Sequence, residues 1–180
     1  ISRYDAGLTL QLERFDVNAV VGYSLDGIQQ LAESKAVRLI ADIPSGPVYC
    51  EVDPRRIDRV LNNLLTNAVE HSEGKPVKIA VAENETAVAI SVTDNGIGMD
   101  IEESAKVFDR FWRADPSRKR TTGGTGLGLA IALEDALAHR GKLEVTAELG
   151  VGSSFRLTIP KQQDIEEYES PLPLIVEKLT

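Results

Sequence analysis

Two asparagines spaced four residues apart are the first side chains in this sequence whose types and spacing could do chemistry. Asn63 and Asn67 stand in the run NNLLTNAVEHS, residues 62–72. Residues four apart share one side of a helix, so the spacing predicts two amides together at the edge of an apolar stripe. Amide oxygens accept hydrogen bonds and are ligands for hard cations such as Mg²⁺. Taken alone, the pair is more typical of surface asparagines.

The second candidate is Asp94, at the end of a predicted strand in the run VTDNGIGM, residues 92–99. It falls on the same face of the strand as the apolar residues at 88, 90 and 92, which predicts a carboxylate pointing toward the core. A buried carboxylate needs a hydrogen-bond donor. The exocyclic amine of a nucleotide base is such a donor, and Gly96 and Gly98 would let a flat ligand approach the backbone. Asp-Asn-Gly is also ordinary turn chemistry, so both interpretations stay open here.

Four glycines stand at the start of a predicted helix in TTGGTGLGLA, residues 121–130. The helix is expected to begin near Gly126, which would leave the amides of residues 125–129 free to bind an anion. The spacing fits neither the P-loop nor the dinucleotide fingerprint, because no Gly-Lys-Ser/Thr follows and no strand precedes. A loop that needs positive backbone angles is the alternative.

A basic segment stands just before these glycines. Residues 110–120 carry five Lys and Arg against one acid, in a chain whose formal net charge is -8. The guanidinium groups of Arg113 and Arg118 could belong to a lid that contacts phosphate. A solvated loop has the same composition, so composition alone does not decide.

The hydrophobic pattern predicts the elements that would position these residues. Apolar residues recur every three or four positions in three long helices, over residues 16–33, from the cap Asp53-Pro54 to about residue 71, and over 126–140. A shorter helix is expected at 101–111. Alternating patterns predict strands at 37–43, 48–52, 77–82, 87–93, 143–148 and 154–159. The expected fold is an α/β two-layer sandwich, in which three long helices cover a mixed, largely antiparallel sheet.

Length and composition are those of one globular domain with flanking segments. The 180 residues divide into a helix end and linker at 1–15, a domain at 16–160, and an acidic, weakly ordered tail at 161–180. The sequence pI of about 4.9 argues against a nucleic acid partner. Cys50 is the single cysteine, which excludes a disulfide within the chain. No apolar run approaches the roughly 18 residues of a membrane span.

The order of these motifs resembles the catalytic domains of sensor histidine kinases. The N, G1, F and G2 boxes of that family correspond to Asn63-x-x-x-Asn67, Asp94-x-Gly96-x-Gly98, Phe108-x-x-Phe111 and Gly124-x-Gly126-x-Gly128. Gly150-Val151-Gly152-Ser153 resembles a further glycine box. The similarity covers about residues 16–160 and implies a Bergerat ATP-binding fold. The run FDRFWRADPSRKRTTGGTGLGLAI, with SPLPL in the tail, resembles one branch of the family in particular.

The resemblance assigns roles to individual positions in a site for ATP and Mg²⁺. Asn67 matches the Mg²⁺ ligand, and Asn63 would support the cation or the phosphates. Asp94 matches the aspartate that accepts the adenine amine, which would favour ATP over GTP. His71 falls near the adenine, in a packing role. Basic lid residues and loop residues would contact the phosphates, namely Arg113, Arg118, Gly124, Thr125, Gly126, Leu127 and Gly128.

Two departures from the family pattern bear on the expected reaction. Glu70 stands where the family often has Lys or Arg, which puts one phosphate contact in doubt. Asn63 stands where gyrase-type and chaperone ATPases carry a glutamate that activates water; an amide cannot act as a base, which favours phosphoryl transfer over hydrolysis. Neither His71 nor His139 has the setting of the family's phosphoacceptor histidine.

The expected function is therefore transfer of the ATP γ-phosphoryl to a histidine on a dimerisation domain outside this chain, and then to a response regulator. The resemblance implies a cytoplasmic domain of a membrane-bound kinase that is homodimeric when complete, while this chain alone would be monomeric and make no direct membrane contact. The alternatives are a related ATPase or anti-sigma serine kinase, and a non-catalytic module that responds to nucleotide.

Overall fold

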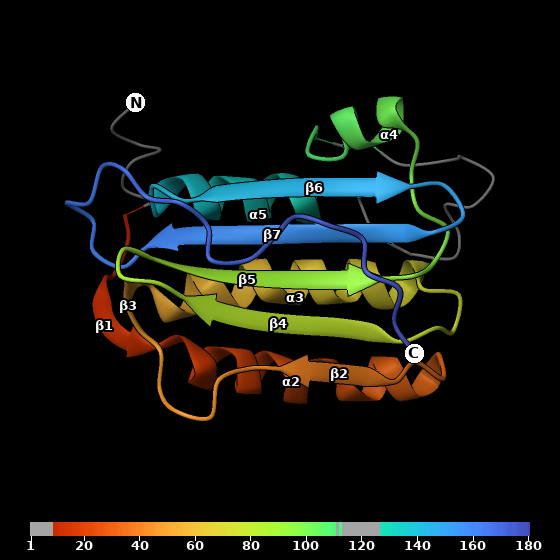
Figure 1. Ribbon diagram of the computed structural model, residues 1–180, viewed down its shortest axis with the longest axis horizontal. Coiled ribbons are helices and arrows are strands. Elements are labelled where there is room, and N and C mark those ends of the chain that lie inside the picture. The colour runs from red at the N-terminus through yellow and green to blue at the C-terminus, as the bar shows by residue number, and fades with distance from the viewer. Residues whose placement is uncertain (1–8, 111, 113–126) are drawn as a thin grey trace.

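A five-stranded sheet with long helices on one face forms the body of the protein in the computed structural model, which describes residues 9–110, 112 and 127–180 (Figure 1). The strand order is β2-β4-β5-β7-β6, and of the neighbouring pairs only β2 and β4 are parallel. The strands are β2 (Leu39–Asp42), β4 (Val77–Glu83), β5 (Ala87–Asp94), β6 (Lys142–Glu148) and β7 (Gly152–Pro160).

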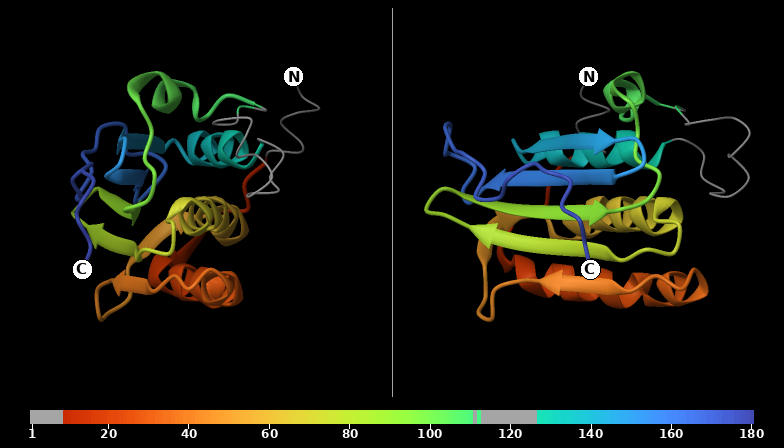
Figure 2. Two further views of the ribbon diagram at one scale, coloured as in Figure 1. Left: turned by 90° about the vertical axis from the view of Figure 1, so that its right-hand side faces the viewer. Right: turned by 45° about the vertical axis from the view of Figure 1, so that its right-hand side comes forward.

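The three long helices lie side by side on the same face of this sheet (Figure 2). They are α2 (Val17–Ser34), α3 (Pro54–His71) and α5 (Gly128–Ala138), while the short α4 (Ile101–Lys106) follows β5. The predicted sandwich of a mixed, largely antiparallel sheet and three long helices is confirmed. α4 is shorter than predicted, and α5 begins at Gly128, two residues after its predicted start.

Helix α3 is central because it contacts both α2 and α5 and also packs on the sheet. Asp53 accepts a hydrogen bond from Arg56 N as the N-cap, and Pro54 occupies the first turn, so the helix begins where the sequence predicts. Seven apolar side chains of α3 are at most 1% exposed, and each Val, Leu or Ile among them contributes about 1.5–3 kcal/mol when fully buried. This stripe fixes the rotation of α3 and places its asparagines along one margin.

A second, two-stranded sheet joins the start of the described chain to the segment before α3. Strand β1 (Glu13–Asp16) pairs antiparallel with β3 (Tyr49–Val52), with Phe15 opposite Cys50. The sequence predicted a helix end and linker for residues 1–15, of which 1–8 lie outside the described residues. The difference arises because the apolar spacing there is also compatible with a helix, whereas the strand depends on a partner more than thirty residues away.

The C-terminal tail, residues 161–180, lies across the face of the sheet opposite the helices (Figure 1). It contains no helix or strand, as its composition indicates, but side chains of the sheet region hold its backbone. Asn84, Arg156 and Asn95 donate hydrogen bonds to the carbonyl oxygens of residues 169, 172 and 177. The expectation of weak order does not describe this arrangement, because composition does not reveal contacts made by distant side chains.

Among the residues that the structure describes, no helix is both long and apolar enough to cross a membrane.

Candidate nucleotide-binding site

The two predicted amides lie on α3, beside the first turn of α5. Asn63 and Asn67 are partly exposed. A Cβ placed on Gly128 would lie 3.2 Å from Asn63 Oδ1, so the start of α5 approaches this asparagine closely. Neither amide side chain has a hydrogen-bond partner within the described part of the chain. Their polar atoms are therefore available to a ligand, and their oxygens suit a hard cation.

Asp94 ends β5 with its carboxyl group buried, as its parity predicts. The residue is 2% exposed. Burial raises the pKa of this carboxyl to about 6, while hydrogen bonds from the backbone of Gly96 and Ser153 act in the opposite direction. The bond from Gly96 N to Oδ1 is 2.9 Å long. A desolvated carboxylate of this kind is stabilised by a further donor, such as an amine.

The glycines after Asp94 allow close approach between segments of the protein itself. A Cβ on Gly96 would lie 1.7 Å from the carbonyl oxygen of His71, and one on Gly98 would lie 2.0 Å from that of Glu148. Ile97 N also donates to His71 O at 3.3 Å. Because these glycines lack side chains, the turn can pack closely between α3 and β6. The sequence predicted instead that the glycines make room for a ligand. Ligand contact through their backbone stays a prediction.

Helix α5 begins without a side-chain cap from the residues that the structure describes. No side-chain hydrogen bond among them is made at its N-cap, Leu127, and the helix is 11 residues long. The first backbone N–H groups of a helix have no partner inside it, and they favour an anion. The start of α5 can therefore receive a phosphate group. Five further predicted site residues lie outside the described residues, namely Arg113, Arg118, Gly124, Thr125 and Gly126.

The structure gathers the described candidates toward one end of the molecule, where α3 and β5 end and α5 begins (Figure 1). His71 closes α3 and is joined through its carbonyl oxygen to the turn after Asp94. Glu70 is partly buried; desolvation raises its pKa and the charge of Lys35 opposes this shift. This end therefore offers amides, helix N–H groups and a buried carboxyl group.

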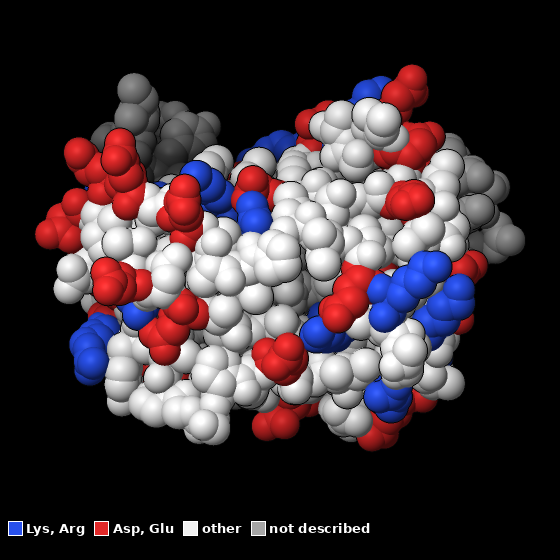
Figure 3. All heavy atoms as spheres, in the orientation of Figure 1, with Lys and Arg blue, Asp and Glu red and all other residues white. Residues whose placement is uncertain are grey.

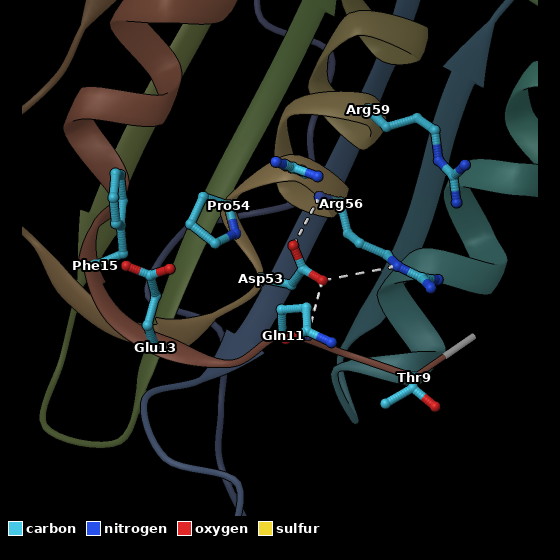
Figure 4. A pocket seen from close by; sticks show the side chains of 9 residues that line it. Thr9, Gln11, Glu13, Phe15, Asp53, Pro54, Arg56 and Arg59 are labelled. Carbon is cyan, nitrogen blue, oxygen red and sulfur yellow. Dashed lines mark hydrogen bonds and ion pairs between the residues drawn. The ribbon is translucent and has the colours of Figure 1, made fainter. Parts of the chain in front are cut away.

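The opposite end of α3 carries a pocket of about 1030 Å³ that sequence reasoning missed (Figure 4). Its lining includes Arg55, Arg56 and Arg59, which would attract an anion if they were unpaired. The buried Asp135 of α5, however, binds Arg56 at 3.2 Å and Arg59 at 2.7 Å. The cluster thus fastens α3 to α5.

His139 belongs to the same structural cluster. Its Nε2 accepts a hydrogen bond from Asp53 N at 3.0 Å, so Nδ1 carries the proton and donates to Asp135 O at 2.7 Å. Burial lowers the pKa of the imidazole. Both nitrogens are occupied, which agrees with a structural role.

The family model for histidine kinase-, DNA gyrase B-, and HSP90-like ATPases matches residues 52–163. This chain belongs to that ATPase family. The matched range begins just before α3 and ends just after β7, so it includes both asparagines, Asp94 and the start of α5. Among the residues that the structure describes, no cluster of three or more His, Cys, Asp or Glu could hold a metal ion.

Within the family, the chain is similar to sensor histidine kinases. It is 49% identical to the sensor histidine kinase MtrB of Mycolicibacterium paratuberculosis over 97% of the chain and 31% of that protein, and thus spans about a third of its length. The catalytic domain of the histidine kinase ThkA superimposes with a TM-score of 0.76 at 25% identity, covering 86% of this chain and 99% of that one. Full-length ShkA in complex with AMPPNP superimposes with a TM-score of 0.74 at 27% identity, covering 84% of this chain and 31% of that one.

These matches confirm the predicted ATP-binding domain of the histidine kinase type. They also confirm the predicted resemblance of the chain to one branch of the family, that of MtrB. The Mg²⁺ ion and the roles of individual site residues stay predictions.

Proposed function

We propose that this chain is the catalytic part of a sensor histidine kinase, which transfers the γ-phosphoryl group of ATP to a histidine on a dimerisation domain of the same kinase. The observation that carries the proposal is the buried carboxyl of Asp94 at the end of the molecule where α5 begins. A response regulator, of the MtrA-like type given the similarity to MtrB, would then receive the phosphoryl group. The complete kinase would be a membrane-bound homodimer with this domain in the cytoplasm.

Adenine recognition is assigned to Asp94. Its carboxylate accepts the exocyclic amine of adenine, a donor that guanine replaces with a carbonyl oxygen. His71, at the end of α3 beside the turn that follows Asp94, contributes packing near the base. The N–H groups of residues 127 and 128 contact phosphate oxygens, and Arg113, Arg118, Gly124, Thr125 and Gly126 extend these contacts in the proposal.

Mg²⁺, when bound, neutralises phosphate charge. Asn67 would hold it, with Asn63 in support, because both carry partly exposed amide oxygens without partners in the described chain. Positioning of the phosphates and charge neutralisation supply most of the catalysis in phosphoryl transfer. In the transfer, a bond forms between a histidine nitrogen and the γ-phosphorus while the bond to the β,γ-bridging oxygen breaks. Asn63 has no basic group to activate water, which favours transfer over hydrolysis.

Labelled ATP tests this proposal. The chain is mixed with [γ-³²P]ATP, Mg²⁺ and a separately purified dimerisation domain from an MtrB-type kinase. We expect an acid-labile, base-stable label on the dimerisation domain, and none when its histidine is replaced by glutamine. ATP binding without transfer would favour a nucleotide-responsive module. Release of phosphate alone would favour an ATPase, and an acid-stable label on a partner protein would favour a serine kinase.

A further inference from the structure

The face of the sheet opposite the helices, here called the outer face, is buried although the three long helices all lie on the other side (Figure 2). Strand parity puts small and hydroxyl side chains on it. Ala89 lies opposite Thr158, and Thr93 lies opposite Ser154. Their exposures are 0%, 1%, 4% and 1%, respectively. A face of small residues becomes this inaccessible only when another segment covers it.

The C-terminal tail is the segment that runs over the outer face (Figure 1), and much of the centre of the molecular surface on this side is uncharged (Figure 3). The tail does not extend the sheet as a strand. Instead, hydrogen bonds that involve side chains attach it at intervals. Near the start of β6, the hydroxyl of Tyr168 donates to Arg140 O at 2.6 Å. Over β7, Arg156 donates to Leu172 O at 2.7 Å. The tail is thereby held along its length.

Asn95, which directly follows Asp94, makes the last of these attachments with both atoms of its amide. Its Nδ2 donates to Glu177 O at 2.8 Å, and its Oδ1 accepts from Leu179 N at 2.6 Å. Lys78 of β4 adds an ion pair of 2.8 Å with the carboxylate of Glu177. Two hydrogen bonds of the tail therefore meet at Asn95 in the turn after β5, and the ion pair attaches Glu177 to the neighbouring strand β4. Asn95 Nδ2 also donates to Asp94 O at 3.3 Å.

We propose that residues 177–179 of the tail form a buttress for the nucleotide site, and that Asn95 is a positioning residue through which they hold the turn carrying Asp94. This inference rests on the proposed function. The turn is clamped from one side by α3, through the contact of Gly96 with His71. The tail holds it from the outer face. The two restraints together fix the direction of the Asp94 carboxylate, which an adenine amine must meet within hydrogen-bond distance.

Asn95→Ala is the principal test, with Tyr168→Phe as the matched control. Both variants remove tail attachments, but Tyr168 lies far along the tail from Asp94. Isothermal titration calorimetry of the whole chain is carried out with ATP and with inorganic tripolyphosphate, which lacks adenine. We expect Asn95→Ala to weaken ATP binding by about tenfold and to leave tripolyphosphate binding unchanged, because it displaces only the adenine contact. Tyr168→Phe should leave both affinities unchanged.

Lys78→Met is a second variant that leaves the turn itself intact. It removes the ion pair with Glu177 and should weaken ATP binding about twofold, again without an effect on tripolyphosphate. Equal loss of both ligands in Asn95→Ala would indicate general damage to the site and would overturn the inference. Wild-type ATP affinity in both variants would overturn it as well. Failure of the unaltered chain to bind ATP would instead overturn the proposed function.

Discussion

At the scale of single residues, the buried titratable groups of Asp94 and His139 are assigned different roles because their hydrogen-bond partners differ. Asp94 is assigned to ligand binding and His139 to a structural role. Asp94 is held by two backbone donors and keeps capacity for a further donor. His139 has both ring nitrogens engaged by the backbone of Asp53 and Asp135. Burial raises the pKa of the acid and lowers that of the base, so both favour the neutral form. Only the Asp94 carboxyl can accept a further hydrogen bond, which a bound ligand could donate.

Asp94→Asn should raise the melting temperature of the nucleotide-free chain at pH 7.5 and change it little at pH 3. The folded state raises the pKa of this carboxyl from 3.8 to about 6, so folding favours the protonated form. The stability that this group contributes is complete below about pH 3.8 and is lost as the pH rises from there through about 6. Because Asn cannot ionise, the free energy of unfolding should differ by roughly 3 kcal/mol at pH 7.5. Thermal unfolding that shows the same shift at both pH values would contradict this.

Asn67→Ala should remove most of the Mg²⁺ dependence of ATP binding. In the unaltered chain, we expect chelation of Mg²⁺ to weaken binding by about tenfold, because phosphate charge is then uncompensated. The variant should bind with similar affinity with and without the metal. Asn62→Ala changes the exposed neighbour on α3 and serves as the control. Calorimetry that shows the same metal dependence in Asn67→Ala as in the unaltered chain would refute the ligand assignment.

At the scale of elements, the site depends on how closely the turn after β5 meets the end of α3. Gly96→Ala should therefore weaken ATP binding at least about tenfold and lower the free energy of unfolding by about 1–3 kcal/mol, since its Cβ would lie 1.7 Å from His71 O. Gly27→Ala is the control, because a Cβ there meets nothing within 4 Å. That change in α2 should stabilise the chain by about 0.5–1 kcal/mol. Unchanged ATP affinity in Gly96→Ala would show that the turn tolerates displacement.

The elements that the sequence predicted well are those specified locally. Asp53-Pro54 marks the start of α3, and alternation marks the two hairpins, because capping groups and strand parity lie within a few residues. Strand β1 and the course of the tail could not be predicted in the same way. Phe15 pairs with Cys50, and Asn95 binds residues 177 and 179, so these contacts depend on distant partners. In the candidate site, the burial of Asp94 was predictable from parity, whereas the importance of its neighbour Asn95 was not.

At the scale of the whole molecule, the two ends of the α3–α5 pair have separate tasks. The end near Asn63 carries the candidate site. The other end is fastened by Asp135, which is 0% exposed and pairs with Arg56 and Arg59. This cluster also reaches the start of the described chain, since Gln11 N donates to the Asp53 carboxylate at 2.9 Å.

Asp135→Ala should lower the free energy of unfolding by about 3 kcal/mol while changing ATP affinity less than about twofold. The loss removes the Asp135 carboxylate from the largely buried guanidinium of Arg56, which keeps its pair with Asp53 at 3.9 Å, and removal of one member of a buried pair is costly. Arg59→Met should cost less than about 1 kcal/mol, because its side chain is 51% exposed and water screens the pair. Chemical denaturation measures both. A large fall in ATP affinity in Asp135→Ala would show that the two ends are coupled.

The tail has a further consequence for how the chain is made. Residues 170–179 are translated after every strand that they cover, so the outer face is open to solvent while the rest of the sheet is already complete. Uncovered sheet surface on a partly synthesised chain promotes aggregation. Folding of this domain is therefore completed only after residues 170–179 have left the ribosome, when they can protect the alanines and threonines of β5 and β7 from association with other nascent chains.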